Sequence, residues 1–200
     1  MRHLCRMFVM LGLLAGSSML FAQDNESTLR VKLITSAGDI TLRLYPEKSP
    51  VTVENFLAYV DSGFYNGTIF HRVISNFMVQ GGGFTTAMTE KVSGEPIVNE
   101  SRNKLHNIRG TVAMARTSDP DSATAQFFIN QRSNLQLDWA PGKEGYTVFG
   151  EVVKGMGVVD FIATAETDTG LMTTGAGQRP FQDVPVEAIV IKEIVRVRGK

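Results

Sequence analysis

The sequence predicts a mainly β, all-β-class fold: a closed antiparallel barrel capped at its ends by two α-helices. Many short apolar runs alternate with polar residues, which is typical of half-buried strands. Nineteen glycines divide the 200 residues into short elements. Only two segments carry helix signals, and neither a repeat nor a linker interrupts the pattern, so we expect one folded domain.

A hairpin and a helix are predicted first. Alternating apolar residues within 28–45 indicate two strands around a turn at 36–39. The helix should begin after Ser49, its predicted N-cap, with Pro50 at its first position, and end at Gly63. One face of this helix is apolar and should pack against the sheet; it carries Val53, Phe56, Leu57 and Val60.

The next stretch contains a charged residue within apolar strands. Strands are predicted at 69–74 and 77–79, the second of which ends at a glycine triplet. Alternation puts Phe70 and Arg72 on one face of the first strand and His71 on the other, so we interpret His71 as structural rather than as a general base. A buried guanidinium must be paired or must face a wet cleft. The alternative is a barrel strand with a snorkelling arginine.

The second half of the chain continues the β pattern. A polar loop at 85–107 leads to a strand of small residues at 110–115. The other predicted elements are strands at 126–130, 146–153 and 186–197, a helix at 156–165 and a Gly/Thr-rich loop at 167–177. The phenylalanines assigned to the core are Phe56, Phe70, Phe127 and Phe149.

Residues 1–22 have the three-part pattern of a secretory signal peptide. A short basic start precedes an uncharged run at 7–21, and Ala22 ends that run before polar residues. The run is shorter than the roughly 20 apolar residues of a membrane span. We therefore expect export, with 23–200 as the mature domain. Leu20 is larger than the residue usual two positions before a cleavage site, which leaves an uncleaved N-terminal anchor as the alternative.

Composition excludes several classes of function. The single cysteine, Cys5, lies in the predicted signal, so the mature chain has no disulfide and no thiol nucleophile. The formal net charge is zero and no long basic run occurs, which disfavours nucleic acid and anionic membranes as partners. The three histidines lack the spacing of zinc ligands. The glycine triplet lacks the Lys-Ser/Thr of a phosphate loop and should form a turn or bulge.

Four ordered segments resemble the signatures of the cyclophilin-type peptidyl-prolyl cis-trans isomerases. They are FHRVISNFMVQGG at 70–82, GTVAMAR at 110–116, the segment 122–130 with QFFI near its end, and VFGEV at 148–152. The resemblance extends over roughly 29–197 and is closest to the exported, periplasmic bacterial members. It implies an eight-stranded antiparallel barrel with two helices, a substrate groove along the outside of the sheet, and a periplasmic isomerase.

The resemblance also implies roles for individual residues. Arg72 matches the catalytic arginine. The residues matching the apolar pocket for the proline ring are Phe77, Met78, Phe128 and Leu137. Those that would hold the peptide or line the groove are Gln80, Gln126, Ala115 and the backbone of Arg116. Gln136 and Tyr146 stand where many eukaryotic members carry a groove tryptophan and histidine, so we expect weak cyclosporin binding.

The residue types suit rotation about an X–Pro bond. The barrier is about 18–20 kcal/mol because the amide has partial double-bond character. No bond is broken, so the reaction needs no nucleophile, metal or cofactor. In the twisted state the proline nitrogen becomes pyramidal and basic, and a guanidinium that keeps its proton is a suitable hydrogen-bond donor to it. Arg72 would therefore act as an electrostatic stabiliser, helped by a dry apolar pocket, and not as a general acid.

The same residues bear on other possible functions. A non-catalytic chaperone or assembly module could hold proline segments in the same groove, but simple capture would not need Arg72. Glu95 and Glu100 could mimic a glycosidase pair, although they lie in a polar loop without an apolar wall. One tryptophan and four tyrosines argue against a carbohydrate-binding face. We expect a monomer that acts on proline-containing segments of unfolded or exported proteins, without stable membrane association after signal cleavage.

Overall fold

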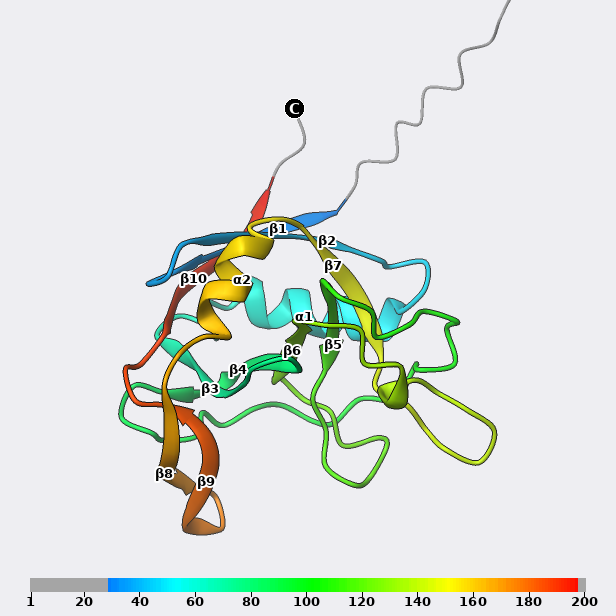
Figure 1. The fold of residues 1–200 in the computed structure, drawn as a ribbon. Helices are drawn as coiled ribbons and strands as arrows, with labels where there is room; N and C mark the ends of the chain where they lie inside the picture. Colours follow the sequence, from blue (N-terminus) through cyan, green and yellow to red (C-terminus); the bar gives the residue numbers. More distant parts are fainter. Residues whose placement is uncertain (1–28, 198–200) are drawn as a thin grey trace, which may run out of the picture.

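The computed structural model describes residues 29–197, and eight of its strands form a closed antiparallel barrel (Figure 1). The barrel strands are β1 (Arg30–Thr35), β2 (Asp39–Leu44), β3 (Thr68–Ile74), β4 (Met78–Thr85), β5 (Thr111–Met114), β6 (Phe127–Asn130), β7 (Val148–Lys154) and β10 (Val190–Val197). Their order around the barrel is β1-β10-β3-β4-β6-β5-β7-β2, and β2 pairs with β1 to close it. The predicted eight-stranded barrel is confirmed.

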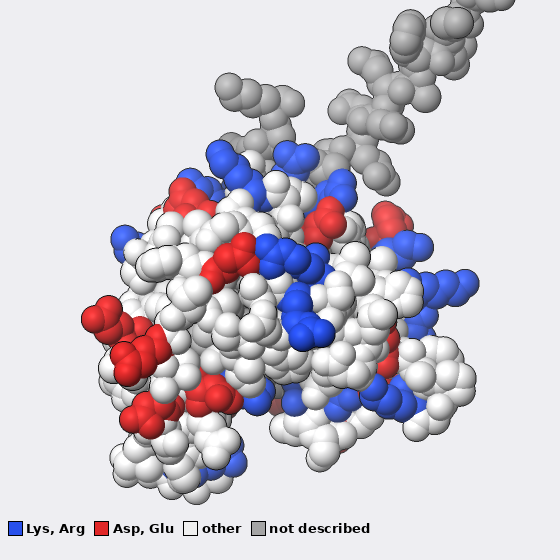
Figure 2. All heavy atoms as spheres, in the orientation of Figure 1, with Lys and Arg blue, Asp and Glu red and all other residues white. Residues whose placement is uncertain are grey.

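The N-terminal predictions concern a different part of the chain. The predicted signal peptide, residues 1–22, and its cleavage site lie outside the described residues. Within 29–197, none of the helices has the length and apolar character needed to cross a membrane. On the face shown in Figure 2, acidic and basic side chains are interspersed with uncharged surface, in keeping with the formal net charge of zero.

Two α-helices pack against the barrel and share its core. They are α1 (Pro50–Asp61) and α2 (Met156–Ile162), and a short 3-10 helix, η1 (Leu135–Leu137), lies between β6 and β7. The predicted apolar face of α1 is buried. The centre of its Phe56 ring lies 5.1 to 5.7 Å from the ring centres of Tyr65, Phe127 and Phe149. These aromatic rings, together with alternate apolar residues of β1 and β2, fill the inside of the barrel.

The start of α1 is stabilised differently from the prediction. Ser49 precedes the helix as expected, but its side chain does not cap it; its hydroxyl donates to the carbonyl of Val148 instead. The carboxylate of Glu100 accepts hydrogen bonds from the backbone N–H groups of Val51 and Thr52. Glu100 therefore satisfies free N–H groups of the first turn from a distant loop, a position in which negative charge is favourable.

The glycine triplet lies inside β4 instead of ending it. Gly82 has a φ of +85°, and a Cβ atom there would lie 2.8 Å from the Tyr65 ring and 2.9 Å from the Phe127 ring. Only glycine avoids both the backbone strain and the clash with these core rings. The strand therefore continues to Thr85 while its neighbours pack directly against its backbone.

A bulge in β3 changes which residues share a face. Phe70 pairs with Gly81 and Arg72 pairs with Gln80, so His71 is an extra residue on the β3 side. Phe70 consequently points into the barrel core, whereas Arg72 lies on the outer surface. The prediction that Phe70 and Arg72 share a face is wrong, because the bulge breaks the simple alternation.

The segment predicted as a Gly/Thr-rich loop is part of a β-hairpin. Its strands, β8 (Thr167–Thr174) and β9 (Gly177–Pro185), pair with each other outside the barrel and project from it in Figure 1. Met172 and Val184 of the hairpin are buried, and they pack against Ile69 and Phe84 of the barrel. This apolar cluster, Ile69, Phe84, Met172 and Val184, fixes the hairpin beside β3.

We predict that Gly82→Ala destabilises the protein by about 2–4 kcal/mol, because alanine would be strained at positive φ and would overpack the Tyr65 and Phe127 rings. Denaturant unfolding measures the change. Gly157→Ala is the matched control: a Cβ at Gly157 in α2 meets no atom within 4 Å. We expect this variant to be as stable as the wild type or slightly more stable. Equal effects of the two substitutions would contradict the packing argument.

Candidate active site

Most of the predicted site residues surround one small pocket on the outer face of the barrel. The pocket has a volume of about 100 Å³ and is lined by Arg72, Phe77, Met78, Gln80, Ala115, Arg116, Phe128, Leu137 and Tyr146. The residues come from β3, β4, β6, η1 and the segments that flank β5 and β7. Of the predicted set, Gln126 and Gln136 do not line this pocket.

Strand register explains the apolar part of the pocket. Gln80 of β4 lies opposite Phe128 of β6, and Met78 shares their face because it is two residues before Gln80. The rings of Phe128 and Tyr146 meet edge to face with centroids 5.7 Å apart. Met78 and Phe128 are buried, whereas Leu137 is half-buried at the rim. The arrangement is a short apolar slot that is open on one side.

Arg72 stands at the edge of this slot with its side chain 42% exposed. It lies directly opposite Gln80 in the β3–β4 register. Its Nε atom is 3.6 Å from a carboxylate oxygen of Asp183 in β9. The guanidinium is thus beside both an apolar surface and an amide, where it can act on a bound ligand without being buried and unpaired.

A second hollow of about 300 Å³, which has mostly polar residues around it, adjoins the pocket. The two hollows share Gln80, Ala115 and Arg116, so together they form a groove. Gln126 lies in the second hollow, where its Oε1 accepts a hydrogen bond of 3.1 Å from Nε2 of Gln80. A Cβ at Gly83 would lie 2.5 Å from the Gln126 side chain, so glycine at this position leaves room for the amide pair.

Arg116 contributes its side chain as well as its backbone. Its guanidinium lies 4.4 Å from the centre of the Tyr146 ring and donates to the carbonyls of Thr117 and Glu144 at 2.8 Å. The sequence had predicted a role in the groove only for the backbone of Arg116. The guanidinium packs on one face of the Tyr146 ring and fixes this ring beside the pocket.

His71 lies behind the groove and not in it. It is 1% exposed, and the centre of its ring lies 4.7 Å from the centre of the Phe84 ring. Its Nε2 atom lies 3.4 Å from the amide nitrogen of Gln80. Burial lowers the pKa of His71 to about 4, and the positive charge of Arg72 acts in the same direction. His71 is therefore neutral near pH 7, which agrees with a structural interpretation.

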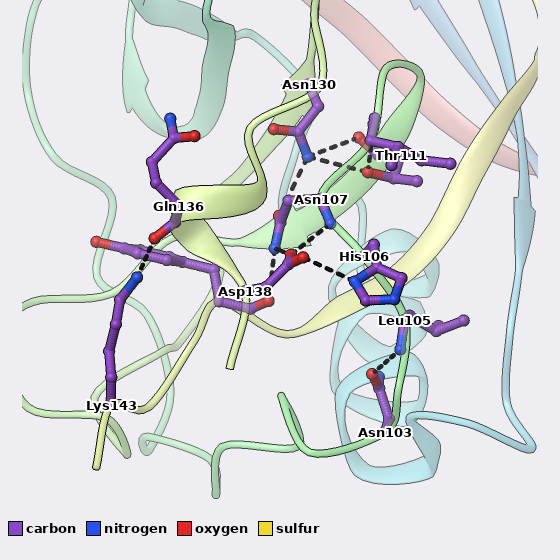
Figure 3. Close-up of polar contacts among 11 residues, drawn as sticks. Asn103, Leu105, His106, Asn107, Thr111, Asn130, Gln136, Asp138 and Lys143 are labelled. Carbon is purple, nitrogen blue, oxygen red and sulfur yellow. Dashed lines mark hydrogen bonds and ion pairs between the residues drawn. The ribbon is translucent and has the colours of Figure 1, made fainter. Parts of the chain in front are cut away.

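A network of asparagines anchors the segment that carries Leu137 (Figure 3). The Asp138 carboxylate accepts hydrogen bonds from the backbone and side chain of Asn107 and pairs with Nδ1 of His106 at 2.7 Å. Partial burial raises the pKa of Asp138, but the hydrogen bonds from Asn107 and His106 outweigh it and lower that pKa overall. Asn107 in turn accepts from the buried Asn130 side chain at 3.1 Å.

The same network reaches the wall of the pocket. Asn134 is 1% exposed, and its side-chain amide donates to the carbonyl of Phe77 at 2.9 Å and to Oδ1 of Asn130 at 2.8 Å. The backbone N–H of Tyr146 donates to the carbonyl of Leu137 at 2.9 Å. The buried side chains of Asn134 and Asn107 thus reach two residues that line the slot, because Asn107 donates to the carbonyl of Tyr146 at 3.3 Å. The sequence pattern did not reveal these asparagines because their partners lie far away in the chain.

Two residues near η1 lie away from the pocket. The Gln136 side chain is exposed, and its carbonyl accepts a hydrogen bond from Lys143 (Figure 3). The guanidinium of Arg102 lies 5.4 Å from the centre of the Trp139 ring, and both residues line a separate hollow. Within residues 29–197 the groove therefore receives no tryptophan, and Gln136 does not reach the slot.

Known proteins resemble this chain in both sequence and structure. A model of the family described as cyclophilin type peptidyl-prolyl cis-trans isomerase/CLD matches residues 30–195. The chain is 52% identical to peptidyl-prolyl cis-trans isomerase A of Dickeya dadantii over 166 residues, which are 83% of this chain and 83% of that protein. It is 51% identical to peptidyl-prolyl cis-trans isomerase B of Escherichia coli, covering 80% of this chain and 94% of that protein.

Solved structures give the same result. A crystal structure of a Cryptosporidium parvum cyclophilin-type isomerase, solved in the presence of the dipeptide Ala-Pro, aligns with a TM-score of 0.68 and 28% identity. The alignment covers 85% of this chain and 99% of that one.

We predict that His71 makes stability depend on pH. The unfolded state takes up a proton near pH 6.5, whereas the folded state does so only near pH 4. The free energy of unfolding is therefore highest above pH 6.5, where His71 is neutral in both states. It falls by about 3 kcal/mol in total as the pH falls from 6.5 to 4, because only the unfolded state binds the proton in this range. Chemical denaturation across this range should show that His71→Asn flattens the fall. Lys192→Gln, which changes an exposed side chain of β10, should retain it; the same flattening in both variants would assign the effect elsewhere.

Proposed function

The chain belongs to the cyclophilin-type peptidyl-prolyl cis-trans isomerases and is an enzyme of that activity, and we propose that Arg72 and the apolar slot beside it catalyse the isomerisation. The observation that carries this assignment is the position of a half-exposed guanidinium at the edge of a pocket walled by Met78, Phe128 and Leu137. We further propose that the substrates are proline-containing segments of unfolded or exported proteins.

The slot would hold the proline ring. Met78 and Phe128 provide an apolar floor, and the Tyr146 ring, fixed by Arg116, provides a wall. Burying the ring there removes water from the amide to be rotated, which strengthens any hydrogen bond made to it. The peptide on either side of the proline would follow the groove across Gln80 and Gln126, whose amides can bond to its backbone.

Arg72 would stabilise the twisted amide. In the planar ground state the proline nitrogen shares its lone pair with the carbonyl and is a poor acceptor. In the twisted state the lone pair is localised, so a guanidinium N–H bonds to it more strongly than to the ground state. The guanidinium keeps its proton, because arginine is not deprotonated in proteins. The contribution is electrostatic, and no proton is transferred.

The geometry also suits a polymeric substrate. The slot is open on one side and adjoins the second hollow, so a chain can cross the site without threading through it. One solved relative was crystallised in the presence of the dipeptide Ala-Pro. Weak cyclosporin binding stays a prediction; it rests on Gln136 and Tyr146 in place of the groove tryptophan and histidine.

We place the enzyme in the periplasm. This proposal rests on the signal-peptide pattern of residues 1–22. A protein that assists folding there would meet exported chains while they are still unfolded, when their prolines are accessible.

We predict that Arg72→Ala lowers kcat/KM for a short X–Pro peptide at least about tenfold, which corresponds to about 1.4 kcal/mol of transition-state stabilisation. The cis-to-trans rate is followed on the purified protein. Arg30→Ala removes an exposed arginine at the start of β1 and should leave the rate within about twofold. An unchanged rate in Arg72→Ala would contradict the assignment and favour a groove that only binds proline segments.

We predict that the signal is removed during export. Expression of the full chain in a Gram-negative host, followed by fractionation and intact-mass analysis, should give a periplasmic protein that begins at residue 23. Leu13→Arg and Leu14→Arg, introduced together, place two charges in the apolar run and should keep the chain in the cytoplasm. A full-length, membrane-bound product from the wild type would support the uncleaved anchor instead.

A further inference from the structure

Asp183 occupies an unusual backbone position. It lies in β9 where Asp168 pairs with Val184 and Gly170 pairs with Phe181, so the β9 side holds one extra residue. Asp183 has a φ of +61°, in the left-handed region, which is uncommon for any residue other than glycine even though aspartate tolerates it better than most. The bulge and the positive φ together redirect this side chain from the regular alternation of the strand.

The side chain is directed toward the proposed catalytic group. A carboxylate oxygen of Asp183 lies 3.6 Å from Nε of Arg72. The neighbouring residue, Val184, belongs to the apolar cluster that fixes the hairpin beside β3. The carboxylate is therefore carried on a short side chain from an anchored backbone, and its position is set by the fold.

The ion pair is too exposed to be explained by stability. The side chains of Arg72 and Asp183 are 42% and 37% exposed, and pairs of this kind contribute little to folding. A long arginine side chain nevertheless loses much rotational freedom when it must act in one geometry. An interaction at Nε limits that freedom and leaves the two terminal amino groups of Arg72 directed to a ligand.

We propose that Asp183 is a positioning residue that holds the Arg72 guanidinium at the edge of the slot. The inference rests on the proposed role of Arg72 and extends it. The hairpin β8–β9, which is not part of the barrel, thereby takes part in catalysis. Because the contact should matter most in the transition state, its loss should lower kcat with little change in KM.

Asp183→Gly is the principal variant, since it removes the carboxylate and also relieves the positive φ. We expect kcat to fall about fivefold or more, KM to change less than twofold, and the melting temperature to stay the same or rise. Asp183→Asn, which keeps an oxygen acceptor without the charge, should retain an intermediate rate. Asp168→Asn removes an exposed carboxylate from the same hairpin and should match the wild type.

Two further measurements separate positioning from a structural effect. In an Arg72→Ala background, Asp183→Gly should change the rate less than twofold, because the two residues act as one unit. The ¹⁵N relaxation of the Arg72 Nε–H group should report greater mobility in Asp183→Gly. Equal effects in both backgrounds, an unchanged kcat, or a faster enzyme would overturn the inference. If Arg72→Ala alone leaves the rate unchanged, the assignment of Arg72 fails as well; if it slows the enzyme and Asp183→Gly does not, only the role of Asp183 fails.

Discussion

Aromatic rings fill the closed barrel that residues 29–197 form, and this constraint governs where function can lie. Phe56, Tyr65, Phe127 and Phe149 occupy the interior and contact one another across it. A substrate can therefore be held only on the outer surface of the sheet, by side chains that point away from the core. Outer surfaces are normally wet, so the slot and the hollow beside it need walls from segments outside the barrel. The slot is bordered by η1 and the loop before β7, and the hollow is bordered by the β8–β9 hairpin.

Departures from ideal strand geometry adapt the barrel to this task. The extra residue in β3 lets Phe70 remain in the core while Arg72 reaches the groove. Because position 82 is glycine, the rings of Tyr65 and Phe127 can pack directly on the backbone of β4. Because position 83 is glycine, the Gln126 side chain has space beside the same strand. The irregularities of β3, β4 and β9 all lie next to the groove, which is where bulges commonly direct side chains toward a ligand.

Sequence could predict what short motifs and local patterns determine. The barrel, α1 and the lining of the slot follow from alternation, capping signals and the four family-like segments, in which Arg72, Met78 and Phe128 stand at fixed positions. The β8–β9 hairpin was missed because it buries little more than Met172 and Val184 and carries many threonines and glycines. The cap supplied by Glu100 and the amide network of Asn134 could not be predicted, since each depends on groups distant in sequence that only the folded chain brings together.

The pairing between β1 and β10 joins the two ends of the described chain, with Arg30 of β1 opposite Val197 of β10. During synthesis from the N-terminus, β1 has no partner on that side until the last strand has left the ribosome. Such a topology has high contact order, so closure should be slow and late. Vectorial synthesis alone thus keeps the barrel open until β10 has been made. An enzyme proposed to act on the folding of other chains is itself delayed in folding by its own connectivity.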